Sequence, residues 1–135
     1  MKKTVLLIED DYLDIESVKR AFKKLNVDCD LHVAHNGADG LALLTGSASQ
    51  NTRITPDIII LDINMPKMSG IEFLRIVKNY YSFKNIKIFI LTTSMEEYDK
   101  FSTETLGIDG YIIKPLSFTA PVSPETAKFI DALLN

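Results

Sequence analysis

The chain has 135 residues, 46% of them hydrophobic, and a formal net charge of −3 from 15 basic and 18 acidic residues. This length and apolar content suit one globular domain. The mild net charge and the lack of a Lys/Arg block argue against a nucleic-acid-binding protein, which carries clustered basic residues. Cys29 is the only cysteine, acids follow residue 8 too early for a signal peptide, and the apolar runs are too short to span a bilayer, so we expect a cytoplasmic protein with no membrane partner.

Short apolar runs alternate with stretches of helical spacing along the chain. The first part predicts a strand at Val5–Ile8, a helix through Ile15, Val18, Phe22 and Leu25, a strand at Asp30–Ala34 and a helix at Leu41–Leu44 that ends at Gly46. A polar surface loop is expected from Thr45 to Asp57. The second part predicts a strand at Ile58–Leu61, a helix through Ile71, Leu74, Val77 and Tyr81, a strand at Ile86–Leu91, a helix over Met95–Thr105, a strand at Tyr111–Ile113 and a last helix that Ser123 caps, with Pro124 at its first position.

Five strands that alternate with five helices indicate a parallel sheet with right-handed crossovers. The unbroken apolar runs indicate that most of these strands are buried on both faces, so the helices must cover both sides of the sheet. The predicted fold class is therefore α/β, a doubly wound five-stranded parallel sheet with helices on both faces.

Polar residues follow four of the expected strands at their carboxyl ends: Glu9 and Asp10, Asp62, Thr92, and Lys114. In a doubly wound sheet this edge is where ligands bind, so we expect these side chains to converge. Carboxylates packed together repel one another unless a cation separates them, and Mg²⁺ accepts a few carboxylates as ligands. The neighbouring Asp11 is expected instead to cap the first helix.

These residues resemble the motifs of response-regulator receiver domains. The resemblance rests on the acidic pair Glu9/Asp10, on the segment LDINMPKMSG around Asp62, on Thr92 and on the Lys114–Pro115 pair, and it covers nearly the whole chain. It is strongest to chemotaxis-type single-domain receivers of flavodoxin-like fold, and the long loop with the LTTS segment is similar to receivers paired with phytochrome-type kinases. It implies a single receiver domain over residues 1–135 with no output domain.

The resemblance also implies roles for the individual residues. Asp62 would accept a phosphoryl group from the phosphohistidine of a sensor histidine kinase or a histidine phosphotransfer protein, as the phosphoprotein of a two-component system or phosphorelay. Glu9, Asp10, Asp62 and the backbone carbonyl of Asn64 would hold Mg²⁺, while Lys114 and Thr92 would contact the phosphoryl group. Tyr111 would turn inward when Thr92 moves, and the Lys114–Pro115 peptide bond would be cis.

Such a protein is not an enzyme in the usual sense, because it catalyses only its own phosphorylation and dephosphorylation. Its expected partners are the phosphodonor and a downstream protein target, which it signals to by protein contact, and a second copy of the chain is a further candidate. A nucleic acid is not expected among its partners.

Two other classes of protein share parts of this pattern. A haloacid-dehalogenase-type phosphatase uses a strand-terminal Asp, and a toprim-type nuclease pairs a Glu with an Asp-x-Asp motif, but both expect an acid where Asn64 stands, and the phosphatase expects Thr where Pro66 stands. Those two enzymes form the first class. The second class is a binding module of receiver fold that is never phosphorylated, and such modules usually lack one of the acids, the Thr or the Lys. Mass measurement after incubation with acetyl phosphate and Mg²⁺ separates the three classes.

Overall fold

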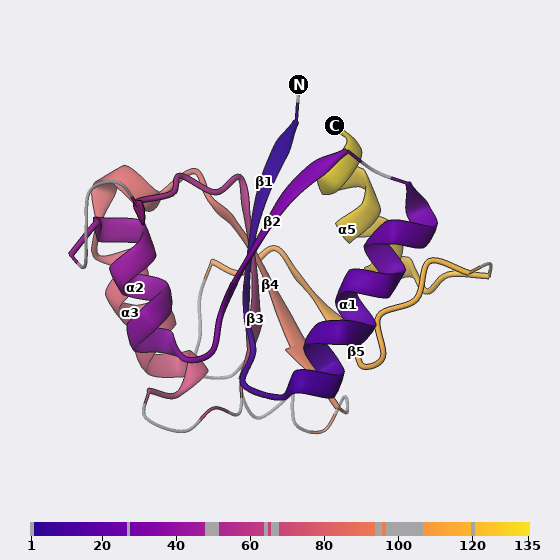
Figure 1. Ribbon diagram of the computed structural model, residues 1–135, viewed down its shortest axis with the longest axis horizontal. Helices are drawn as coiled ribbons and strands as arrows, with labels where there is room; N and C mark the ends of the chain where they lie inside the picture. Colours follow the sequence, from indigo (N-terminus) through magenta and orange to yellow (C-terminus); the bar gives the residue numbers. More distant parts are fainter. Residues whose placement is uncertain are drawn as a thin grey trace.

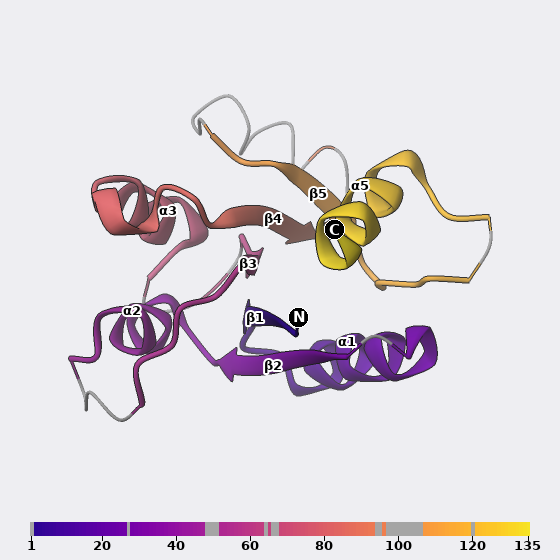
Figure 2. The ribbon, with the colours of Figure 1, turned by 90° about the horizontal axis from the view of Figure 1, so that it is seen from above.

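The structure, a computed structural model, describes residues 2–26, 28–47, 52–63, 65, 68–93, 96, 107–119 and 121–135. Five strands form one parallel sheet in the order β2-β1-β3-β4-β5, which Figure 2 shows from above. The strands are β1 (Lys3–Ile8), β2 (Cys29–Ala34), β3 (Ile58–Asp62), β4 (Lys87–Thr92) and β5 (Gly110–Ile113). The order reverses at β1, so β1 and β3 flank the point where ligands bind in such sheets.

Helices cover both faces of the sheet, as Figure 1 shows. One face carries α1 (Tyr12–Leu25) and α5 (Pro124–Leu134), and the other carries α2 (Gly37–Thr45) and α3 (Gly70–Lys78), which is followed by the short 3₁₀ helix η2 (Tyr81–Phe83). The predicted doubly wound α/β fold is confirmed. None of the described helices is long and apolar enough to cross a membrane.

Helix ends lie where the sequence predicted polar or glycine caps. The Asp11 side chain accepts the backbone N–H groups of Leu13 and Asp14, which confirms it as the cap of α1. Ser123 accepts the N–H of Thr126 at the start of α5. Such caps satisfy N–H groups that have no partner inside the helix and contribute about 1 kcal/mol each.

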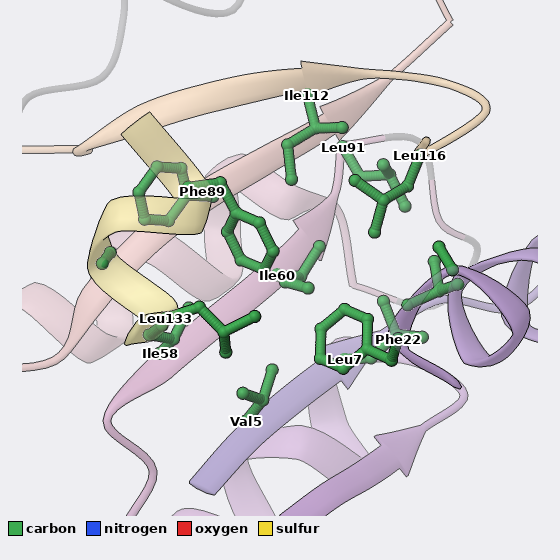
Figure 3. Close-up of a cluster of buried hydrophobic side chains, with 14 of the residues drawn as sticks. Val5, Leu7, Phe22, Ile58, Ile60, Phe89, Leu91, Ile112, Leu116 and Leu133 are labelled. Carbon is green, nitrogen blue, oxygen red and sulfur yellow. The ribbon is translucent and has the colours of Figure 1, made fainter. Parts of the chain in front are cut away.

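Successive side chains of the strands point to opposite faces and form two separate cores. The core under α1 and α5 contains alternate residues of β1 and β3 together with three phenylalanine rings (Figure 3). The ring of Phe129 in α5 is fully buried and lies 5.2 Å from the Phe89 ring and 6.0 Å from the Phe22 ring. Burying a side chain of this kind contributes about 1.5–3 kcal/mol to the stability of the fold. The packing of this core therefore helps to fix the sheet whose carboxyl edge carries the polar residues.

Acidic side chains at the amino end of the sheet accept hydrogen bonds from backbone N–H groups of neighbouring strands. Asp57 precedes β3 and accepts the N–H of Thr4 at 2.9 Å. Asp109 precedes β5 and accepts the N–H of Ile88 at 2.8 Å. These carboxylates complete the hydrogen bonding of neighbouring strands, which leaves the acids at the carboxyl end as the group that needs a different explanation.

Where the structure describes the predicted elements, it agrees with them except at one aromatic residue. Tyr81 was expected on the apolar face of the third helix, but α3 ends at Lys78 and Tyr81 lies in η2 with 79% of its surface exposed. The buried aromatic ring of this region belongs to Phe83 instead. The expected fourth helix, Met95–Thr105, falls almost wholly outside the described residues.

Candidate functional site

Three carboxyl groups from two neighbouring strands meet at the carboxyl end of the sheet. Glu9 and Asp10 directly follow β1, and Asp62 is the last residue of β3, which pairs with β1. Each of the three offers an oxygen, and these oxygens all lie within 4.8 Å of one another. Glu9 is fully buried, Asp62 is 4% exposed and Asp10 is exposed. The structure therefore brings together the three acids that the sequence singled out, with one of them open to solvent.

The donor set of this cluster fits a hard divalent cation. Glu9 Oε1 accepts the backbone N–H of Asp11 at 3.1 Å, but the buried Oε2 has no hydrogen-bond partner among the described residues. A buried carboxylate oxygen without a partner is costly, and a cation with oxygen ligands removes that cost. Mg²⁺ binds through a few carboxylates and keeps several waters, which suits a cluster that is buried on one side and exposed at Asp10.

The electrostatics of Glu9 show the strain that such a cation would relieve. Burial, followed by the hydrogen bond and the negative charge of Asp62, raises the pKa of Glu9 from 4.5 to about 8. The N–H of Asp11 and the ammonium of Lys114 act in the opposite direction and are outweighed. In the metal-free protein, Glu9 therefore holds its proton more tightly than an ordinary glutamate does.

Lys114 places the positive charge of the site. Its Nζ lies 3.0 Å from Glu9 Oε2, in an ion pair without hydrogen-bond alignment, and 3.7 Å from Asp62 Oδ1. The shortest contact of this ammonium, 2.8 Å, is to Oδ2 of Asp14 in α1. Burial alone would lower the pKa of Lys114, but its hydrogen bond to Asp14 and its attraction to Glu9 and Asp62 raise the pKa above its ordinary value. Lys114 is therefore a permanent cation in this cluster.

Asp14 is the residue of this site that sequence reasoning missed. It lies in the first turn of α1, where an acid is explained by the positive end of the helix dipole. The only further signal in the sequence is its position five residues after Glu9, on a helix that starts at the same edge of the sheet. Its pairing with Lys114, across 100 residues of sequence, follows only from the fold.

The expected Lys114–Pro115 bond is cis, as the resemblance implied. Just before it, the N–H of Lys114 donates to the carbonyl of Thr92 at 2.7 Å, which ties the end of β5 to the end of β4. This bond holds the backbone of Lys114 beside the strand that neighbours Asp62.

Thr92 and Tyr111, the two residues of the expected switch, lie in the neighbouring strands β4 and β5. Thr92 ends β4 and is 1% exposed, one residue beyond Leu91, which pairs with Asp62. Tyr111 is half-buried in β5 and packs on the core under α2 and α3. Asn64, whose carbonyl was expected to bind the metal, lies outside the described residues.

Gly70 keeps the backbone behind Asp62 close to α3. A Cβ atom at this position would lie 2.9 Å from the Cα of Ile63 and 3.2 Å from the carbonyl oxygen of Asp62. Contacts this short with backbone atoms are not accommodated by side-chain movement. The glycine in LDINMPKMSG therefore has a packing reason that is specific to the segment following Asp62.

A doubly wound sheet with acids clustered at the ends of β1 and β3 and a lysine after β5 is typical of a receiver domain. The profile of the response regulator receiver domain matches residues 5–121, and the chain belongs to this family. In two-component signalling, such domains receive the signal.

Relatives and solved structures agree with this assignment. The chain is 31% identical to the response regulator Rcp1 of Synechocystis sp. over 112 residues, which cover 83% of this chain and 76% of Rcp1. A two-component response regulator from Legionella pneumophila has 38% identity and a TM-score of 0.81, with 98% of both chains covered. The bacteriophytochrome response regulator AtBRR has 28% identity and a TM-score of 0.84, with 99% of this chain and 91% of AtBRR covered. A structure of Rcp1 in its Mn²⁺-bound form has 27% identity and a TM-score of 0.73, with 97% of this chain and 89% of Rcp1 covered.

Proposed function

We propose that the protein accepts a phosphoryl group on Asp62, with Mg²⁺ bound in the adjacent acidic cluster. The observation that carries this proposal is the arrangement around one carboxylate: Asp62 lies in the cluster with Glu9 and Asp10, while the Lys114 ammonium stands 3.7 Å from Asp62 Oδ1. Phosphoryl transfer depends mostly on positioning and on neutralising charge, and this arrangement supplies both.

In the proposed reaction, an oxygen of Asp62 forms a bond to phosphorus as the nitrogen–phosphorus bond of a phosphohistidine breaks. The imidazole nitrogen leaves with the bonding electron pair and takes up a proton. Glu9, Asp10, Asp62 and the carbonyl of Asn64 would hold Mg²⁺, which supplies charge neutralisation at the phosphoryl oxygens when bound. Lys114 would neutralise a further oxygen, and the Thr92 hydroxyl would donate a hydrogen bond to another.

The proposed phosphodonor is a sensor histidine kinase or a histidine phosphotransfer protein, and the kinases paired with phytochrome-type receptors are the first to test. The similarity to the bacteriophytochrome response regulator AtBRR supports that choice. The protein would catalyse only its own phosphorylation and dephosphorylation and would signal to a downstream protein, with a second copy of the chain as a further partner. We place this activity in the cytoplasm, in keeping with a single, free cysteine, Cys29.

Phosphorylation would be read through Thr92 and Tyr111. When the Thr92 hydroxyl turns toward the phosphoryl group, it leaves space into which the Tyr111 ring rotates. The partner that binds the changed face would in turn favour phosphorylation, because coupling between two sites is reciprocal. Amide exchange with and without beryllofluoride tests this switch. Changed protection at Tyr111 that is lost in Thr92→Ala supports it, whereas changes confined to the acidic cluster contradict it.

The central test is intact mass measurement after incubation with acetyl phosphate and Mg²⁺. We expect one alkali-labile phosphoryl adduct in the wild type and none in Asp62→Asn. Asp57→Asn is the matched control, because Asp57 precedes the opposite end of the same strand and binds the N–H of Thr4 there. A full adduct in Asp62→Asn would refute the assignment of the acceptor. Phosphate release without an adduct would favour the phosphatase class, and no reaction at all would favour a binding module.

A further inference from the structure

Among the described residues, the shortest ion-pair contact of Lys114 is with a carboxylate that lies outside the candidate metal cluster. Asp14 Oδ2 is 2.8 Å from Lys114 Nζ, and the metal-type cluster of the described residues contains Glu9, Asp10 and Asp62 but not Asp14. The other two carboxylates near the ammonium, those of Glu9 and Asp62, both belong to that cluster. Lys114 and a divalent cation would therefore compete for the same two acids.

We propose that Asp14 is a positioning residue that draws the Lys114 ammonium toward α1 and so limits its contacts with Glu9 and Asp62, the two acids that it shares with the metal. Without Asp14, the only carboxylates within 4 Å of this ammonium in the described structure are those of Glu9 and Asp62. The ammonium would then settle between these two ligands and oppose Mg²⁺ by occupying their oxygens and by charge repulsion. This inference rests on the proposed function, because it assumes that the cluster binds Mg²⁺.

Both partners of the ion pair are held by their backbones. The N–H of Asp14 donates to Oδ1 of the cap Asp11, which fixes the first turn of α1. The N–H of Lys114 donates to the Thr92 carbonyl at the end of β4. The Lys114 side chain is 14% exposed and that of Asp14 is 34% exposed, so the pair is partly shielded from water and salt. A pair with this shielding is worth more than an exposed surface pair.

The test is the Mg²⁺ dissociation constant of four proteins, measured by calorimetric titration at fixed pH and ionic strength. Asp14→Asn keeps the shape of the side chain and removes its charge, and we expect the dissociation constant to rise about fivefold or more, the size of a typical coupling between contacting charges. Asp14→Glu keeps the charge and should restore most of the affinity. Glu16→Gln removes the same charge two residues along α1, on another side of the helix, and should change the constant less than about twofold.

A double-mutant cycle with Lys114→Ala separates positioning from simple charge. If Asp14 acts through the lysine, Asp14→Asn should change the Mg²⁺ affinity less than about twofold in the Lys114→Ala background. An equal loss in both backgrounds would overturn the inference, because it would show that Asp14 attracts the metal only by its own charge. An unchanged affinity of Asp14→Asn would overturn it as well.

The proposed function fails in a different way from this inference. A wild-type protein that binds no Mg²⁺ would remove the metal site itself and the inference with it. A wild-type protein that binds Mg²⁺ and forms the Asp62 adduct, together with an Asp14→Asn variant of equal affinity, would remove only the role of Asp14. Circular dichroism and urea unfolding of each variant show that a lost affinity does not come from a lost fold.

Discussion

Replacing Glu9 by Gln should stabilise the metal-free protein, and the gain should grow with pH. Glu9 is fully buried beside Asp62, and its pKa is raised from 4.5 to about 8, chiefly by burial and then by Asp62. Gln has nearly the same shape and keeps an oxygen that can accept the N–H of Asp11, but it carries no charge that burial would oppose. The functional arrangement of the acids is thus expected to cost stability until a cation binds.

The direction of the pH dependence follows from the raised pKa of Glu9. Below pH 4.5 the carboxyl is protonated in both the folded and the unfolded protein, so it contributes no difference. As the pH rises from 4.5 to about 8, the unfolded protein releases this proton and the folded protein retains it, so the free energy of unfolding falls, and it levels off above that range. Lys114, whose pKa is also raised, changes its contribution only at pH values above 10.5.

The size of the effect follows from the same two pKa values. A tenfold change in proton binding corresponds to about 1.4 kcal/mol, so Glu9 opposes folding by less than about 1 kcal/mol at pH 5 and by about 3 kcal/mol at pH 7. Asp62 shares this titration, and we therefore expect Glu9→Gln to gain about 2 to 4 kcal/mol at pH 8.

Urea unfolding from pH 5 to pH 9 in the presence of EDTA measures this gain. The contributions of the other titrating groups cancel in the difference between the unfolding free energies of wild type and Glu9→Gln. Glu16→Gln on α1 serves as the charge-matched control. Adding Mg²⁺ should then raise the urea midpoint of the wild type more than that of the variant. Parallel pH profiles, or a variant that is less stable than the wild type at pH 8, would refute the reasoning.

Three further predictions concern the same edge of the sheet. Mg²⁺ binding at neutral pH should release protons, because the raised pKa of Glu9 favours its protonated form until the metal binds. Calorimetry in two buffers of different ionisation enthalpy should then give different heats, and equal heats would contradict this prediction. Gly70→Ala should lower the free energy of unfolding by about 1–3 kcal/mol, because its Cβ would meet backbone atoms of Ile63 and Asp62. Gly37→Ala should lower it less in the same urea assay, because its Cβ would meet only the flexible side chain of Met68. Thr93→Ala should accelerate labelling by acetyl phosphate, because the branched side chain of Thr93, exposed beside Thr92, is expected to narrow the approach to Asp62. An unchanged labelling rate in a mass-spectrometric time course would contradict this steric effect.

The alternation of apolar runs and helical spacing was enough to predict the fold class and all five strands of the sheet. Val5–Ile8 was expected as a strand and lies within β1, and Ile58–Leu61 lies within β3. These predictions succeed because a strand that is buried on both faces must be apolar at every position, which is a local property. The convergence of Glu9, Asp62 and Lys114 could be predicted for a related reason. In a parallel sheet, the carboxyl ends of all strands lie at one edge, so strand order along the chain is sufficient to bring their last residues together.

The tertiary structure decided the features that depend on how one element faces another. The helical spacing of Ile71, Leu74 and Val77 continues to Tyr81 in the sequence, but α3 ends at Lys78. The aromatic ring that is buried in this region belongs to Phe83. In the same way, nothing in the sequence around Asp14 distinguishes an acid that favours a helix start from one that binds a distant lysine. That distinction depends on the packing of α1 beside the end of β5, which places Asp14 2.8 Å from Lys114. Pairwise contacts between side chains 100 residues apart are a property of the packed fold, because only packing fixes the direction in which each side chain points.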